Sequence, residues 1–168
     1  MKELKPVDYM LLCELMKDSR RSDRQLAKAL RVSQPTVTRR RMRLEKDFLD
    51  GYTAIPRFRK IGFELVAFTF VKSRFRSATA EQKDQAREKG KEFIMNQPNC
   101  IFGASGEGMS WDGVCISFHK SYSDFAEFKR TLKVDGSEFF DESESFVSVL
   151  SPRTIVKPFH FKYLADAK

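Results

Sequence analysis

The sequence predicts an α+β chain, in which an N-terminal group of helices is followed by an αβ-sandwich. Up to residue 50 the apolar residues recur every three or four positions, as in helices, whereas the period-two alternation typical of strands begins at Phe63. Residues 1–60 contain 16 Lys/Arg and 8 Asp/Glu and the rest contain 15 of each, so the net charge of +8 lies in the first part. We therefore expect a polyanion-binding segment joined to a neutral domain with a different role.

The first two helices are predicted from apolar spacing and capping residues. The segment PVDYMLLCELMKDS, residues 6–19, carries a wide apolar stripe, which predicts a well-buried helix. Ser22 is a favourable N-cap residue, and Gln25 stands at the capping-box position three residues later. A short second helix is therefore expected to run to Leu30, with its inward edge formed by Leu26, Ala27 and Leu30.

The third helix is expected in VSQPTVTRRRMRLEK, residues 32–46, which is rich in arginine. Ser33 is a good N-cap residue, and Pro35 is tolerated in a first turn, where its missing N–H would have no helical partner. On a helical wheel one face holds Thr36, Arg39, Arg40 and Arg43, and the opposite face holds Val37, Arg41, Leu44 and Phe48. Taken alone, such a basic face is more often only a solvated surface, so its role depends on context.

From Phe63 onward strand and helix patterns alternate. A strand is expected in residues 63–73, with Val66, Phe68 and Phe70 on one face and Leu65, Ala67, Thr69 and Val71 on the other. A capping box at Thr79 and Gln82 opens a helix that stops before Pro98. Two strands are expected in CIFGASGEG and WDGVCISFH, a helix in SYSDFAEFKRTLK, and closing strands in SFVSVLS and TIVKPFHF. This order is that of the ferredoxin-like βαββαβ fold.

Several kinds of activity and site are not indicated. There is no G-x-S-x-G, P-loop, H-E-x-x-H or paired-cysteine motif, so we expect neither an enzyme nor a cofactor. The cysteines lie among apolar residues and are expected to be reduced, and the histidines are not spaced with them as metal ligands: Cys13, Cys100, Cys115, His119 and His160. No apolar run could span a bilayer and no signal peptide begins the chain, so a cytoplasmic protein is expected.

Two short helices joined by a tight turn at Arg31 and Val32 are the parts of a helix-turn-helix. The surrounding residues resemble the Lrp/AsnC (leucine-responsive, "feast/famine") family of transcription regulators. The resemblance is carried by Asp8, Leu11, Leu12, Asp18, Arg20 or Arg21, Gln25, Leu26, Ala27, Val32, Ser33, Val37, Arg40, Leu44, Gly51-Tyr52-Thr53-Ala54 and Ile61-Gly62. It implies a winged helix-turn-helix DNA-binding domain over residues 1–50, a linking strand or hinge over 51–63, and a ferredoxin-like ligand-sensing and dimerisation domain over 64–168.

Two residues depart from the family pattern. Arg31 stands where the family usually has glycine, so either the turn differs or Arg31 is strained in a left-handed conformation. Arg41 stands in the apolar stripe, where the family usually has an apolar residue. Because a buried unpaired arginine would be very unfavourable, we expect the stem of Arg41 to pack and its guanidinium to reach an edge or an acidic partner.

The predicted function is sequence-specific binding of double-stranded DNA by a transcription regulator. The third helix is expected to enter the major groove, and its side chains to contact base edges and phosphates. The candidate DNA-binding residues are Ser33, Gln34, Thr36, Thr38, Arg39, Arg40, Arg43 and Lys46. We also expect a homodimer or a higher assembly of dimers, because two helices cover only one face of a four-stranded sheet.

The resemblance also implies an effector site at the glycine-containing turn between the second and third strands. Ser105, Gly106 and Asp112 are the candidate effector-binding residues, with backbone N–H groups for a carboxylate and the aspartate for an ammonium group. The effector would be an amino acid or another small molecule. The loop around Trp111 looks longer than in the family, and the alternative is that its glycines only shape a hairpin.

A second function is compatible with the sequence. A ferredoxin-like sheet rich in aromatic residues could stack the bases of single-stranded RNA. Against this RNA-binding alternative, the basic residues cluster in the N-terminal part and not in the predicted sheet. Binding to duplex DNA and to RNA at equal salt would separate the two functions.

Overall fold

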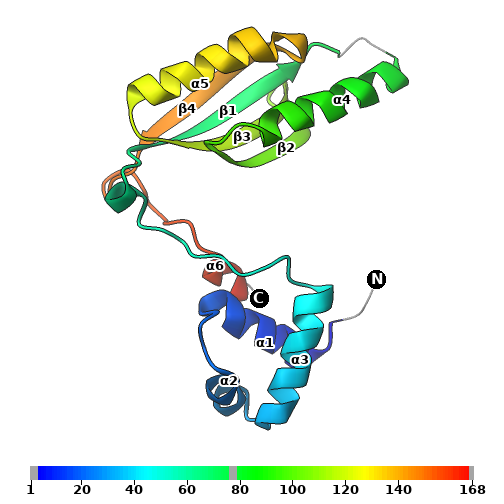
Figure 1. The fold of residues 1–168 in the computed structure, drawn as a ribbon, viewed down its shortest axis with the longest axis vertical. Helices are drawn as coiled ribbons and strands as arrows, with labels where there is room; N and C mark the ends of the chain where they lie inside the picture. The colour runs from blue at the N-terminus through cyan, green and yellow to red at the C-terminus, as the bar shows by residue number, and fades with distance from the viewer. Residues whose placement is uncertain (1–3, 76–78, 167–168) are drawn as a thin grey trace. The chain divides into compact units, whose positions relative to one another are not determined.

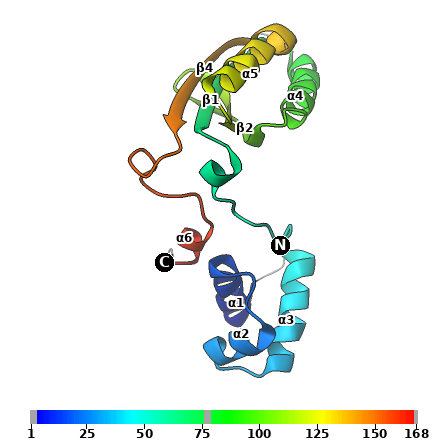
Figure 2. The same ribbon diagram turned by 60° about the vertical axis from the view of Figure 1, so that its left-hand side comes forward.

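A computed structural model describes residues 4–75 and 79–166 and divides the chain into two units (Figures 1 and 2). The helical unit combines residues up to 55 with the segment that begins at Pro158, and the sheet unit is Pro56–Lys157. The domain expected over residues 64–168 therefore ends too late, because the segment from Pro158 belongs to the helical unit. The short helix α6, Lys162–Ala165, packs on the first helix, and Asp166 Oδ1 lies 3.0 Å from Lys17 Nζ. The spacing of apolar residues in the sequence does not predict that this C-terminal segment packs on the helical unit.

The helical unit contains α1 (Pro6–Lys17), α2 (Asp23–Leu30) and α3 (Gln34–Asp47), as predicted. The capping box of α2 is confirmed, because Ser22 and Gln25 each accept a hydrogen bond from the backbone N–H of the other. The apolar faces of the helices meet in one core, whose buried members are Leu11, Leu15, Leu26, Ala27, Val37 and Leu44. Burial of these faces, more than helix propensity, holds such short helices in place.

The turn between α2 and α3 keeps a left-handed residue even though that residue is an arginine. Arg31 ends α2 with φ 55° and ψ 42°, a conformation that favours glycine. The N–H groups of Arg31 and Val32 both donate to the carbonyl of Ala27. Of the two alternatives for this turn, the structure therefore shows the strained Arg31.

Residues 51–63 contain no strand, so of the linking strand or hinge predicted here the strand is absent. Residues 51–57 are irregular, and η1, Phe58–Ile61, is a 3₁₀ turn that ends at Gly62 with φ 93°. Pro56 has no N–H to donate to a ladder, which disfavours pairing of this segment. The described residues of the helical unit contain helices but no strand, so the helix-turn-helix is present without a β-wing.

The sheet unit has the predicted ferredoxin-like order. Its strands are antiparallel and lie in the order β2-β3-β1-β4: β1 (Leu65–Ser73), β2 (Cys100–Gly108), β3 (Trp111–His119) and β4 (Phe140–Val149). Two helices, α4 (Ala80–Met95) and α5 (Tyr122–Val134), lie on one face of the sheet (Figure 1), and the 3₁₀ turn η2 (Asp135–Glu138) leads into β4. The capping box at Thr79 is confirmed.

The closing strand predicted in TIVKPFHF is wrong. Residues 154–161 form turns and irregular structure, and β4 ends at Val149. Pro158 lies inside this segment and cannot donate to a strand ladder. In the described part of the chain no helix has the length and apolar character needed to cross a membrane.

The two faces of the sheet differ in what covers them. On the helix side, Ala67 and Cys115 are buried against Phe125, Phe128 and Leu132. On the other side an apolar row crosses all four strands in register, and we call this side the open sheet face. The row consists of Phe102, Ile116, Phe68 and Phe146, and Phe102 and Phe146 are 52% and 65% exposed.

Candidate nucleic-acid interface

The buried residues of α3 determine which face of this helix is exposed to solvent. Val37 and Leu44 are completely buried against α1 and α2. Ser33 is the N-cap residue, as predicted, but its hydroxyl pairs with the hydroxyl of Thr36 (Oγ–Oγ1 2.8 Å) and not with a backbone N–H. These two candidate residues therefore lie together at the start of α3.

Two arginines of the predicted basic face turn toward α1. Arg40 Nη1 lies 2.6 Å from Asp8 Oδ1, and Arg43 Nη1 lies 3.1 Å from Asp8 Oδ2. Asp8 is 1% exposed, and an unpaired carboxylate at this depth would be very unfavourable. We call these three residues the Asp8 clamp. The clamp fixes α3 against α1 and holds two candidate DNA-binding side chains beside the contact between the helices.

The clamp leaves both guanidinium groups partly accessible. The side chains of Arg40 and Arg43 are 24% and 36% exposed. A guanidinium has five N–H donors, so either arginine can contact a phosphate while it remains on Asp8. Neither can extend into a groove without uncovering a buried carboxylate.

Arg41 reaches acidic partners, as predicted from its place in the apolar stripe. Its Nη1 lies 3.2 Å from Asp23 Oδ1, and its Nε lies 3.1 Å from Glu45 Oε1 and 3.3 Å from the Tyr52 hydroxyl. Burial by itself lowers the pKa of Arg41, but the hydrogen bonds with these three partners outweigh that effect and raise the pKa above its ordinary value. Arg41 therefore ties α3 to α2 and does not belong to its outward side.

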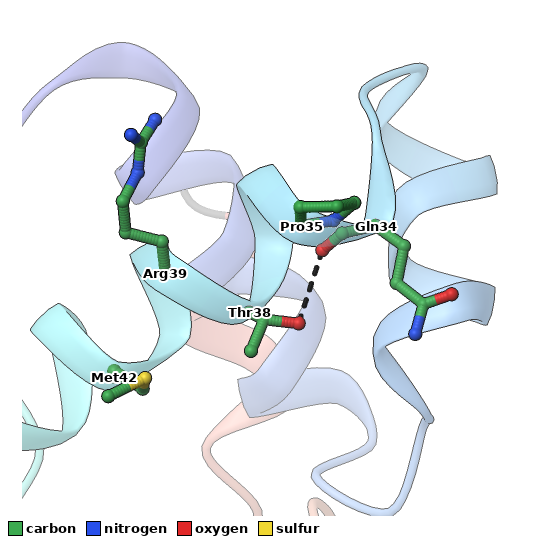
Figure 3. A pocket seen from close by; sticks show the side chains of 5 residues that line it. All are labelled: Gln34, Pro35, Thr38, Arg39 and Met42. Atoms are coloured by element: carbon green, nitrogen blue, oxygen red, sulfur yellow. Dashed lines mark hydrogen bonds between the residues drawn. The ribbon is translucent and has the colours of Figure 1, made fainter.

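Figure 3 shows the side of α3 that faces solvent. An open hollow of about 400 Å³ lies there, and we call it the α3 hollow; it is lined by Gln34, Pro35, Thr38, Arg39 and Met42. Thr38 Oγ1 lies 2.6 Å from Asp23 Oδ2, and this hydrogen bond is the main reason why the pKa of Asp23 is lowered. Among the described residues, the side chains of Gln34 and Arg39 have no hydrogen-bond or ionic partner.

The α3 hollow contains two residues that the arginine pattern did not indicate. Met42 is 66% exposed, and Pro35 is exposed about two helical turns before it. Because residues seven positions apart lie on the same side of a helix, the sequence alone could have indicated that Pro35 and Met42 share one face of α3. Lys46 is exposed further along α3.

The hairpin of β2 and β3 holds the candidate effector-binding residues. Its turn consists of Met109 and Ser110, both left-handed (φ 49° and 66°), so the loop is shorter than the sequence indicated and the extra residues extend the strands. Ser105 and Gly106 line a hollow of about 200 Å³, which we call the hairpin hollow. Asp112, in β3 of the same hairpin, does not line this hollow, and its Oδ2 accepts a hydrogen bond from Ser73 N (2.8 Å).

The helical unit and the sheet unit together define a class of protein. A helix-turn-helix with an exposed third helix, in the part of the chain that carries all of the net charge, is the architecture of a DNA-binding protein. Residues 6–45 match the model of the AsnC-type helix-turn-helix domain.

Curated relatives extend this similarity over most of the chain. An HTH-type transcriptional regulator of Pyrococcus furiosus is 30% identical over 138 residues, which cover 81% of this chain and 86% of the relative. An HTH-type transcriptional regulator of Pyrococcus abyssi is 29% identical over 137 residues, which cover 80% of this chain and 86% of the relative.

Solved structures share the fold. LrpC of B. subtilis has a TM-score of 0.69 at 23% identity and matches 89% of this chain and 96% of its own. A transcriptional regulator of Neisseria meningitidis in complex with L-Met has a TM-score of 0.73 at 19% identity and matches 93% of this chain and 97% of its own. The chain belongs to the Lrp/AsnC family and is a DNA-binding transcription regulator.

Proposed function

We propose that the chain recognises specific double-stranded DNA sequences by placing α3 in the major groove. The observation that carries the proposal is the α3 hollow, an open face on the helix that enters the groove in helix-turn-helix proteins. Arg40 and Arg43 contact phosphates from the Asp8 clamp, and Lys46 contacts a phosphate further along. The proposed interface is Ser33, Gln34, Thr36, Thr38, Arg39, Arg40, Arg43 and Lys46.

Titrations of duplex DNA and single-stranded RNA at equal salt test this proposal. We expect duplex DNA to bind more tightly, and one sequence selected from random duplexes to bind more tightly than the others. Tighter binding of RNA would favour the second candidate function, in which the aromatic row of the open sheet face stacks bases. We propose no catalytic activity, and we propose a cytoplasmic location because the relatives are regulators of Pyrococcus species, in which the DNA lies in the cytoplasm.

We further propose that the protein is a homodimer, or an assembly of such dimers, joined through the open sheet face. An apolar row across four strands is a larger exposed patch than monomeric proteins usually have. A two-fold axis would let each copy cover the row of the other, and the two α3 helices would then suit a two-fold symmetric operator.

The hairpin hollow supports a small-molecule effector. The Neisseria meningitidis regulator of the same fold was solved with L-Met, and we propose that an amino acid or another small molecule binds this chain at Ser105 and Gly106. Asp112, the residue expected to hold the ammonium group, does not line this hollow and accepts a hydrogen bond from Ser73 N, so we propose the site without it. A ligand at a hundredfold excess over Kd would add about 2.7 kcal/mol to the free energy of unfolding, so a thermal-shift screen of the twenty amino acids tests the proposal. A flat result across the screen would leave the hairpin as structure only.

A further inference from the structure

We infer that the α3 hollow is a thymine-reading site, in which the 5-methyl group of a thymine lies between Pro35 and Met42 and Arg39 binds a guanine beside it. The inference deepens the proposed function and rests on it. It adds Pro35 and Met42 to the residues that determine specificity, and it separates Arg39 from the other arginines of α3, which are held by carboxylates.

The first step is to ask which arginine of α3 can read a base. A guanine is read by a guanidinium that extends into the groove and places its donors on O6 and N7. Arg40 and Arg43 would have to leave the buried Asp8, and Arg41 would have to leave Asp23 and Glu45. Arg39 is exposed and has no internal partner among the described residues, so it can extend without uncovering another charge.

The second step concerns the chemistry of the hollow beside Arg39. Its walls include the ring of Pro35 and the thioether of Met42, which is 66% exposed. Carbon walls do not replace the water that hydrogen-bonds the nitrogen and oxygen atoms of a base edge, so polar edges are disfavoured there. The 5-methyl of thymine is the apolar group that base pairs present in the major groove, and a methionine side chain adapts readily to such a partner.

The third step concerns the polar side chains at the edge of the hollow, which limit how a base can approach. Thr38 is held by its hydrogen bond with Asp23, and Gln34 lies one turn before it on the same face of α3 (Figure 3). The apolar walls therefore share one hollow with the polar side chains of Gln34 and Thr38. This arrangement suits a base step in which a thymine methyl is flanked by polar edges.

The test begins with selection of duplexes by the full chain and continues with titrations of the selected site. Each thymine is replaced singly by uracil, which removes only the methyl group. We expect one position in each half-site where uracil weakens binding about fourfold, the effect of burying one methyl group. Met42→Ala should abolish this difference, and Met42→Leu should retain it.

Arg39 is tested on the same site. Arg39→Ala should lower the preference for guanine at the neighbouring position by about 5-fold to 150-fold. The matched control is Lys46→Ala, which should weaken binding to all sequences alike and select the wild-type site. Melting curves establish that each variant is folded.

Two different results would overturn the inference. If folded Met42→Ala and Arg39→Ala bind DNA, select the wild-type site and keep the uracil effect, the thymine assignment is wrong while the proposed function stands. If the wild-type chain selects no sequence and prefers RNA at equal salt, the proposed function fails and the inference fails with it.

Discussion

Asp8 is a buried carboxylate that ties α3 to α1. Asp8→Asn keeps the shape of the side chain but leaves Arg40 and Arg43 close together without their counter-ion. Both arginines are partly exposed, so water screens part of the loss, and we expect the free energy of unfolding to fall by about 1–3 kcal/mol. Urea unfolding followed by circular dichroism measures the change. The exposed Asp50→Asn is the control, and equal stability of the two variants would contradict the role of the clamp.

Arg31 gives a prediction in the opposite direction. Its left-handed conformation costs an L-residue about 1–2 kcal/mol, and glycine adopts it without this cost. We expect Arg31→Gly to raise the free energy of unfolding by about 0.5–1 kcal/mol, because glycine also gains entropy in the unfolded chain. Arg31→Ala removes the same charge but keeps the strain, so it should not be stabilised. Equal melting temperatures for the two variants would show that backbone strain is not the cause.

His119 makes the stability depend on pH. Its side chain is completely buried, with Nε2 2.8 Å from Ser117 Oγ, and burial lowers its pKa below the ordinary value of 6.5 even though Asp124 opposes this effect. The unfolded chain then binds the proton more tightly than the folded chain. Stability is therefore complete above pH 6.5 and is lost as the pH falls from there toward the folded pKa, by up to about 1.4 kcal/mol per pH unit.

Unfolding measured between pH 7.5 and pH 5.5 checks this. His119→Gln should flatten the dependence, and His160→Gln should leave it unchanged. The same slope in all three proteins would assign the effect to other groups.

Among the secondary-structure elements, the four strands carry the clearest unpartnered surface. Phe146 stands at one end of the apolar row and pairs across strands with Phe68. In the proposed dimer Phe146→Lys places two like charges in an apolar contact, which costs several kcal/mol and should yield monomers at micromolar concentration. Sedimentation velocity measures the change. Met95→Lys, on the 77% exposed Met95 of α4, is the matched control and should remain dimeric. A monomeric wild-type chain would contradict the dimer.

At the scale of the whole molecule, charge is divided unevenly between the two parts of the chain. All of the net charge of +8 lies in residues 1–60, so binding to DNA should fall steeply as salt rises. Lys46→Ala should reduce the slope of log K against log salt by about one unit, because it removes one phosphate contact. Lys120→Ala, an exposed lysine of the sheet unit, should leave the slope unchanged. An affinity that does not vary with salt would contradict the electrostatic part of the interface.

The sequence by itself determined the local elements and their order. The three helices of the helical unit, both capping boxes and the βαββαβ order follow from periodic burial and capping, which involve residues a few positions apart. The two faces of β1 were predictable for the same reason. The sequence also indicated that Arg41 must find a partner, since a buried charge cannot remain alone.

Only the tertiary structure decided what depends on contacts between distant residues. Arg40 and Arg43 meet Asp8 across 32 and 35 positions of the sequence. A helical wheel compares residues of one helix only, so it could not predict these ion pairs. The return of residues 158–166 to the helical unit and the absence of a linking strand likewise depend on which surfaces meet. Local patterns report whether a side chain is buried, whereas its partner is decided when the elements pack, because ion pairs form between groups that packing brings within a few ångströms.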